Sequence, residues 1–159
     1  MEQVRRLVAP LVQWRGLRIT PLCYLRWSIG SCYLWFGALK LVPGLSPAEL
    51  LAERTIGTLT LGLIAGKWAL SLLAALEMSI GFALITGLML RTALVVLIGH
   101  MICTLSPIVI FPQEVFTHVP YGLTLVGQYI IKNFVIMSGA WIVLRSLAPD
   151  VRNAVGTEP

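Results

Sequence analysis

Four long apolar stretches constrain this chain more than any other feature of its sequence. They cover about residues 22–42, 68–89, 92–112 and 123–145. Each is close to the length of about 20 residues that an α-helix needs to cross the hydrocarbon core of a bilayer. Backbone polar groups in that core must be hydrogen-bonded internally, which a helix achieves within a single segment. The sequence therefore predicts an all-α integral membrane protein, built as a four-transmembrane-helix bundle.

The composition supports one membrane domain over residues 1–159. Hydrophobic residues make up 57% of the chain and charged residues only 12%, whereas about 25% of a soluble domain is charged. This balance excludes a soluble enzyme and a disordered chain. It also excludes a nucleic-acid-binding domain despite the formal net charge of +5, because basic residues on so apolar a chain typically face lipid headgroups.

Lysine and arginine are unevenly divided between the two ends of the predicted spans. One side carries Arg5, Arg6, Arg15, Arg18, Arg26, Arg91, Arg145 and Arg152. The other side carries Lys40, Arg54 and Lys67, and the loop at 113–122 has no basic residue other than His118. The positive-inside rule then predicts that the tails at 1–21 and 146–159 are cytoplasmic. The expected location is the inner (cytoplasmic) membrane.

The segment between the first two spans predicts a short amphipathic helix at the outer end of the bundle. Ser46-Pro47-Ala48-Glu49 has the pattern of a capping box, with proline at the first helical position. We expect the helix to run from this cap towards Thr58 and to cover the outer end.

Polar residues recur at helical spacing within the predicted spans. The first span has a stripe of Arg26, Gly30, Tyr33, Gly37 and Lys40. The fourth has Gln128, Lys132, Val135 and Gly139, flanked by Tyr129 and Asn133. His100, Thr104 and Pro107 share a face of the third, and the second contains Glu77. Because ionisable groups in lipid are costly, these stripes are expected to face the bundle interior.

Counting from the outer edge of each span places several ionisable groups at one depth. Tyr33, Glu77 and Lys132 each lie nine residues in, and His100 about twelve. An unpaired charge at the bilayer centre costs at least about 2.5–3.5 kcal/mol. We therefore expect Glu77 to pair with Lys132, with Tyr33 and His100 beside the pair.

This predicted cluster has two interpretations. One is a buried salt bridge that fixes helix register, and the other is a polar pocket for a small ligand or a quinone headgroup, or a proton path. The candidate ligand-binding residues are Tyr33, Lys40, Glu77, His100, Thr104, Gln128, Tyr129, Lys132 and Asn133. No spacing of histidine, cysteine and carboxylate residues predicts a metal site, and no catalytic residue can be assigned.

Three short motifs lie around the first and last spans. Leu34-Trp35-Phe36-Gly37-Ala38-Leu39-Lys40 ends the first span, and Pro43-Gly44-Leu45-Ser46-Pro47-Ala48-Glu49 follows it. Gly127-Gln128-Tyr129-Ile130-Ile131-Lys132-Asn133 opens the last span. With these motifs the chain resembles the DoxX/DoxD-like family of small four-helix bacterial membrane proteins. Some relatives carry an acidic residue where this chain has Val126.

The resemblance implies a subunit of an oxidoreductase or quinol oxidase in the cytoplasmic membrane, in some relatives linked to oxidative stress. The sequence has no flavin, haem or thiol motif, so no intrinsic cofactor is expected. A quinone or a partner subunit would supply any redox chemistry, and the chain itself would be at most an accessory subunit.

Three functions remain open from the residues. The first is a redox- or stress-linked membrane subunit whose pocket meets a quinone or small lipophilic ligand. The second is a non-catalytic scaffold that stabilises a partner complex or the envelope. The third and weakest is a small-solute permease, which four helices would form only as a homo-oligomer.

Overall fold

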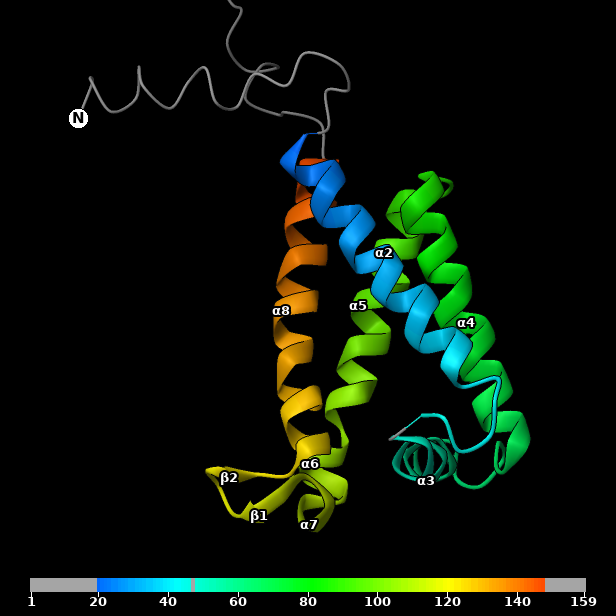
Figure 1. Ribbon diagram of the computed structural model, residues 1–159, viewed down its shortest axis with the longest axis vertical. Coiled ribbons are helices and arrows are strands. Elements are labelled where there is room, and N and C mark those ends of the chain that lie inside the picture. Colours follow the sequence, from blue (N-terminus) through cyan, green and yellow to red (C-terminus); the bar gives the residue numbers. More distant parts are fainter. Residues whose placement is uncertain (1–19, 47, 148–159) are drawn as a thin grey trace, which may run out of the picture.

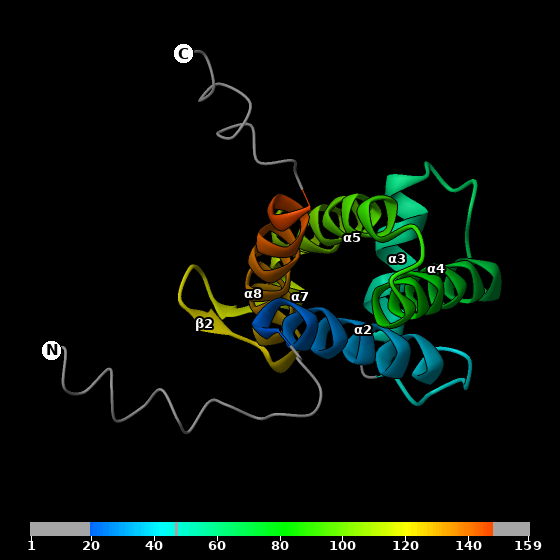
Figure 2. The same cartoon turned by 90° about the horizontal axis from the view of Figure 1, so that it is seen from above.

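The computed structural model describes residues 20–46 and 48–147, and the protein is mostly helical. Its long helices are α2 (Pro21–Leu39), α4 (Lys67–Thr86), α5 (Leu90–Leu105) and α8 (Leu125–Ser146), which run side by side (Figure 1). Seen from above, they surround a common interior (Figure 2). The start of α2 and the end of α8 lie at the same end of the molecule (Figure 1).

Three segments are long and apolar enough to cross a membrane: Lys67–Thr86, Leu90–Ile110 and Leu125–Ser146. They correspond to the second, third and fourth predicted spans, so these predictions are confirmed as regards helix, length and apolarity. Helix α2 covers the first predicted span with 19 residues but is not among the segments of sufficient apolarity. This helix contains the polar residues Arg26 and Tyr33, and Lys40 follows it directly.

The helix ends follow local sequence signals. The hydroxyl of Thr20 caps α2 by accepting a hydrogen bond from the Cys23 N–H at 3.2 Å, with Pro21 in the first turn. Helix α5 ends before Pro107, which lacks the N–H that would bond the Cys103 carbonyl. The Ser106 hydroxyl donates to that carbonyl instead, at 2.7 Å. A one-turn helix, α6 (Pro107–Ile110), then continues the segment.

Glycines allow α2 and α4 to approach each other closely. A Cβ atom added at Gly81 would lie 2.8 Å from both the Gly30 carbonyl oxygen and the Leu34 backbone nitrogen. At Gly37, an added Cβ would lie 3.1 Å from the Cβ of Glu77. Small residues at such crossings are typical of helix pairs in membranes. The predicted interior stripe of α2 is confirmed by the burial of Gly30, Tyr33 and Gly37.

The main apolar core lies nearer the end that holds residues 20 and 147. It is formed by Ile29, Tyr33, Ile80, Leu84, Leu94, Leu97, Met101, Ala140 and Val143. Many large apolar side chains point outward, including Trp35 (70% exposed) and Val135 (74% exposed). Buried polar groups and exposed apolar groups together are the pattern expected where lipid surrounds the helices.

The opposite end is closed by short elements. These are α3 (Glu49–Leu59), α7 (Pro112–Val115) and an antiparallel hairpin of β1 (Phe116–His118) and β2 (Gly122–Leu123). The side chain of Arg54 in α3 pairs with that of Glu114 in α7 at 3.0 Å. The prediction of a short helix between the first two predicted spans is thus confirmed.

The capping box predicted for α3 is wrong. The helix begins at Glu49 with Ala48 as its cap residue and has no side-chain cap. The Glu49 carboxylate instead accepts a hydrogen bond from the Gly44 N–H at 2.8 Å. The carboxylate therefore closes the preceding turn and leaves the Ser46 hydroxyl without the capping role.

Candidate functional site

A buried ion pair joins the end of α2 to the middle of α4. The Lys40 ammonium lies 2.6 Å from Oε2 of Glu77, and the two side chains are 11% and 10% exposed. Lys40 also donates to the Phe36 carbonyl at 3.3 Å. The close approach at Gly37 positions this pair, because it brings the α4 backbone at Glu77 against α2. The α2 helix is inclined to the other long helices (Figure 1), and its C-terminal end reaches Glu77 in the middle of α4.

His100 of α5 continues the polar contacts from this pair to Tyr33. Its Nε2 atom lies 3.7 Å from Oε1 of Glu77, and its Nδ1 atom is 3.1 Å from the Tyr33 hydroxyl. The two rings meet edge to face, with centroids 5.8 Å apart. Tyr33, Glu77 and His100 are all buried, at 5%, 8% and 9% exposure. We call this series of neighbouring side chains, Lys40–Glu77–His100–Tyr33, the polar chain.

The polar chain contains hydrogen-bond donors and acceptors in alternation. A neutral imidazole accepts a hydrogen bond at one ring nitrogen and donates from the other. When Nδ1 accepts from the Tyr33 hydroxyl, Nε2 carries a proton and faces the Glu77 carboxylate. In the structure Nε2 is buried and has no hydrogen-bond partner within the described residues. A short movement of either side chain would therefore complete a link from hydroxyl to carboxylate.

A second polar contact lies one turn further along α5. Asn133 of α8 donates from its amide nitrogen to the Thr104 hydroxyl at 3.1 Å, and Thr104 donates to the Met101 carbonyl at 2.8 Å. Both side chains are half-buried. This contact joins α5 to α8, and His100 and Thr104 share a face of α5 because they are four residues apart.

The predicted pairing of Glu77 with Lys132 is wrong. Lys132 is exposed on the outer face of α8, and its ammonium lies 5.3 Å from the centroid of the Tyr129 ring. Gln128 and Tyr129 are also exposed, and so is Val135 of the predicted interior stripe. The residues of α8 that are buried are Gly127, Ile130, Gly139, Ala140 and Val143.

The structure therefore divides the nine candidate residues into two groups. Six lie inside: Tyr33, Lys40, Glu77 and His100 in the polar chain, and Thr104 with Asn133 beside it. Gln128, Tyr129 and Lys132 lie outside. Lys40 was included as a candidate, but its role as the partner of Glu77 was missed. The signal was present in the sequence, since Gly30, Gly37 and Lys40 form one stripe.

No group of three or more histidine, cysteine or carboxylate side chains could hold a metal ion within residues 20–46 and 48–147. The cysteines Cys23, Cys32 and Cys103 are free thiols. The side chains of the polar chain can form hydrogen bonds, pair charges and transfer protons.

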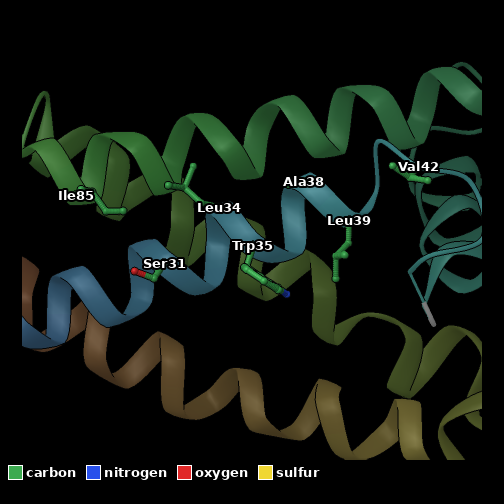
Figure 3. A pocket seen from close by; sticks show the side chains of 7 residues that line it. All are labelled: Ser31, Leu34, Trp35, Ala38, Leu39, Val42 and Ile85. Atoms are coloured by element: carbon green, nitrogen blue, oxygen red, sulfur yellow. The ribbon is translucent and has the colours of Figure 1, made fainter.

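An apolar groove of about 420 Å³ lies on the other side of α2 (Figure 3). It is lined by Ser31, Leu34, Trp35, Ala38, Leu39, Val42 and Ile85. Trp35 and Ala38 are exposed and occupy the face of α2 opposite the buried Tyr33 and Gly37. The groove and the polar chain are therefore separate features.

Comparison with known proteins gives no match for this chain among protein-family profiles, curated proteins or solved structures.

Proposed function

We propose that the protein is a multi-pass inner-membrane protein with four spans, in which α2 is the first. Support comes from the way α2 distributes its residues. Tyr33 is buried and Lys40 is paired with Glu77, while Trp35 and Phe36 on other faces are 70% and 51% exposed. A helix of modest average apolarity can cross a bilayer when its polar side chains face other helices.

The basic residues of the sequence favour cytoplasmic ends for the first and last spans. On this topology Glu114 faces the outside, and Leu88 in the turn between α4 and α5 faces the cytoplasm. In a variant whose three native cysteines are replaced, Glu114→Cys should react with a membrane-impermeant thiol reagent in intact cells. Leu88→Cys should react only after the cells are opened. The reverse pattern would invert the topology.

Within this membrane protein, the polar chain is proposed to accept and release protons. One observation carries the proposal: four ionisable side chains from three helices lie in contact or nearly so. Between Glu77 and Tyr33, Nε2 of His100 has no hydrogen-bond partner among the described residues. Ionisable residues inside a membrane protein commonly mark proton or ion pathways. A pair built only for stability needs neither the histidine nor the tyrosine.

The wider function proposed is that of a redox- or stress-linked subunit similar to the DoxX-like proteins. The polar chain suits a quinone headgroup poorly, because the Tyr33 hydroxyl and Nδ1 of His100 are bonded to each other and Lys132 lies outside. We therefore assign redox chemistry to a partner subunit or to a quinone outside the polar chain. The role of this chain's own residues is to hold and pass the proton.

Substitutions at Tyr33 and His100 test this function. Tyr33→Phe and His100→Gln each remove one proton-carrying group and largely preserve side-chain shape. We expect both variants to fold with a loss of about 1–3 kcal/mol of unfolding free energy, because each leaves a buried group without its hydrogen-bond partner. Stress protection should be lost when either variant is supplied to cells that lack the gene.

Tyr129→Phe and His118→Gln are the matched controls, since both residues are exposed, and each should protect fully. Native mass spectrometry of gently extracted protein would identify any partner chain or quinone that co-purifies. If Tyr33→Phe and His100→Gln protect as well as the controls, the polar chain is a structural element. The scaffold function would then replace the proposed one.

A further inference from the structure

Arg26 lies against the turn that joins α4 to α5. A Cβ atom added at Gly87 would lie 3.2 Å from one terminal nitrogen of the Arg26 guanidinium and 3.8 Å from its central carbon. Gly87 has a φ of 84° and ends α4. Glycine suits this position because of its backbone conformation, and an added Cβ would also crowd the Arg26 guanidinium.

The guanidinium has an unused donor. Its Nε atom is buried and has no hydrogen-bond partner in the part of the chain that the structure describes. Among the described residues the carboxylates are Glu49, Glu53, Glu77 and Glu114. They lie in α3, in the middle of α4 and in α7, so none is placed at this turn. A guanidinium normally satisfies its donors with carboxylate or phosphate oxygens.

A second arginine lies at the same turn. Arg91 is exposed in the first turn of α5, which has no acidic residue and no side-chain cap. A cation there lies near the positive end of the helix dipole, which is electrostatically unfavourable. An anion bound at the turn would relieve this repulsion and would face Arg26 as well.

The position of the turn relative to the proposed membrane surface identifies the kind of anion. Its tip is formed by Leu88 and Met89, which are 61% and 76% exposed. Trp27, beside Arg26, donates from its indole nitrogen to the Ile85 carbonyl at 3.2 Å. Exposed apolar tips together with tryptophan and arginine are typical of the boundary between acyl chains and headgroups. Lipid phosphates lie at this level.

We propose that Arg26 and Arg91 form a binding site for the phosphate of an anionic phospholipid at the α4–α5 turn. The proposal depends on the membrane placement given under the proposed function but not on proton transfer by the polar chain. Lipid binding at this turn would hold α2 against the α4–α5 pair.

The test uses the full chain purified in mild detergent. Thermal unfolding is followed while phosphatidylglycerol, phosphatidylcholine or inorganic phosphate is added, and native mass spectrometry counts the lipids retained. We expect phosphatidylglycerol to stabilise the protein more than the other two additives. Arg26→Gln and Arg91→Gln should each raise the phosphatidylglycerol concentration needed for half of this effect about tenfold.

Arg145→Gln is the matched control, because it removes an equal charge from an arginine of α8 that lies over Trp141. It should leave the phosphatidylglycerol response unchanged. An equal loss in all three variants would mean diffuse charge attraction, and no loss in any would mean no site; either result overturns the proposal. Equal stabilisation by inorganic phosphate would also overturn it, by assigning the site to free phosphate.

Two further results separate this proposal from the others. If Arg26→Gln fails to fold, Arg91→Gln alone tests the proposal, because the Arg91 side chain is exposed. Tyr33→Phe should retain the full phosphatidylglycerol response, so a failure of the polar chain's function would leave the lipid site intact.

Discussion

Replacing either Glu77 or Lys40 alone is expected to destabilise the protein by about 3–5 kcal/mol, whereas replacing both should cost much less. The two side chains are 10% and 11% exposed and lie 2.6 Å apart. Glu77→Gln leaves the ammonium of Lys40 buried without its counter-charge, and Lys40→Met leaves the carboxylate in the same state. The double variant buries neither charge.

Unfolding in detergent, followed for the two single variants and the double variant, measures the coupling between these residues. Lys132→Met is the matched control, because Lys132 is a lysine of the last helix that lies outside. Lys132→Met should change the stability of the unsubstituted protein little. Added to Glu77→Gln, it should neither restore nor further lower the stability of that variant. If the losses from Glu77→Gln and Lys40→Met simply add up, the two groups do not interact in the folded protein.

Adding one methyl group at Gly81 is expected to destabilise the contact between α2 and α4. The new Cβ would lie 2.8 Å from the Gly30 carbonyl oxygen and from the Leu34 backbone nitrogen. Backbone atoms cannot turn aside as a flexible side chain can, so the helices must separate. We expect Gly81→Ala to cost about 1–3 kcal/mol of unfolding free energy, as overpacking of a close contact usually does.

Gly99→Ala provides the comparison, since an added Cβ at Gly99 has no atom within 4 Å. This substitution should be neutral, or stabilising by up to about 1 kcal/mol through the higher helix propensity of alanine. Separation of α2 from α4 should also move Lys40 away from Glu77, so the Gly81→Ala variant should show weaker coupling between them. Equal stability of the two alanine variants would show that the helices do not meet at Gly81.

The sequence was sufficient to predict the helices and the interior face of α2. Apolar length located the long helices to within a few residues. The predicted spans 68–89 and 92–112 ran through the breaks at Gly87 and Pro107, where backbone chemistry ends the helices. The stripe of α2 was identified correctly because its glycines and polar residues recur together. Only one face of the helix contains both the small residues for a close approach and the groups that need partners.

The orientation of α8 and the partner of Glu77 were not predictable in the same way. Helix α8 has polar and apolar residues on several sides, so Gln128 and Lys132 could be aligned with Gly139 as easily as Ile130 with Ala140. Counting residues gives the depth of a group but not the direction in which it points. Lys40 lies at the end of its helix, and it meets Glu77 because α2 and α4 approach each other closely at Gly37.

Infrared difference spectra of the protein in lipid, recorded as the pH is changed, would show whether the polar chain exchanges protons. The C=O band of a protonated carboxylic acid reports on Glu77, and the Glu77→Gln variant identifies that band among those of the other carboxylates. We expect a band that is absent from Glu77→Gln and shifted in Tyr33→Phe and His100→Gln, because proton exchange at Glu77 depends on its neighbours. Identical spectra for the unsubstituted protein and Glu77→Gln, over the whole pH range in which both stay folded, would contradict proton transfer and leave a static ion pair.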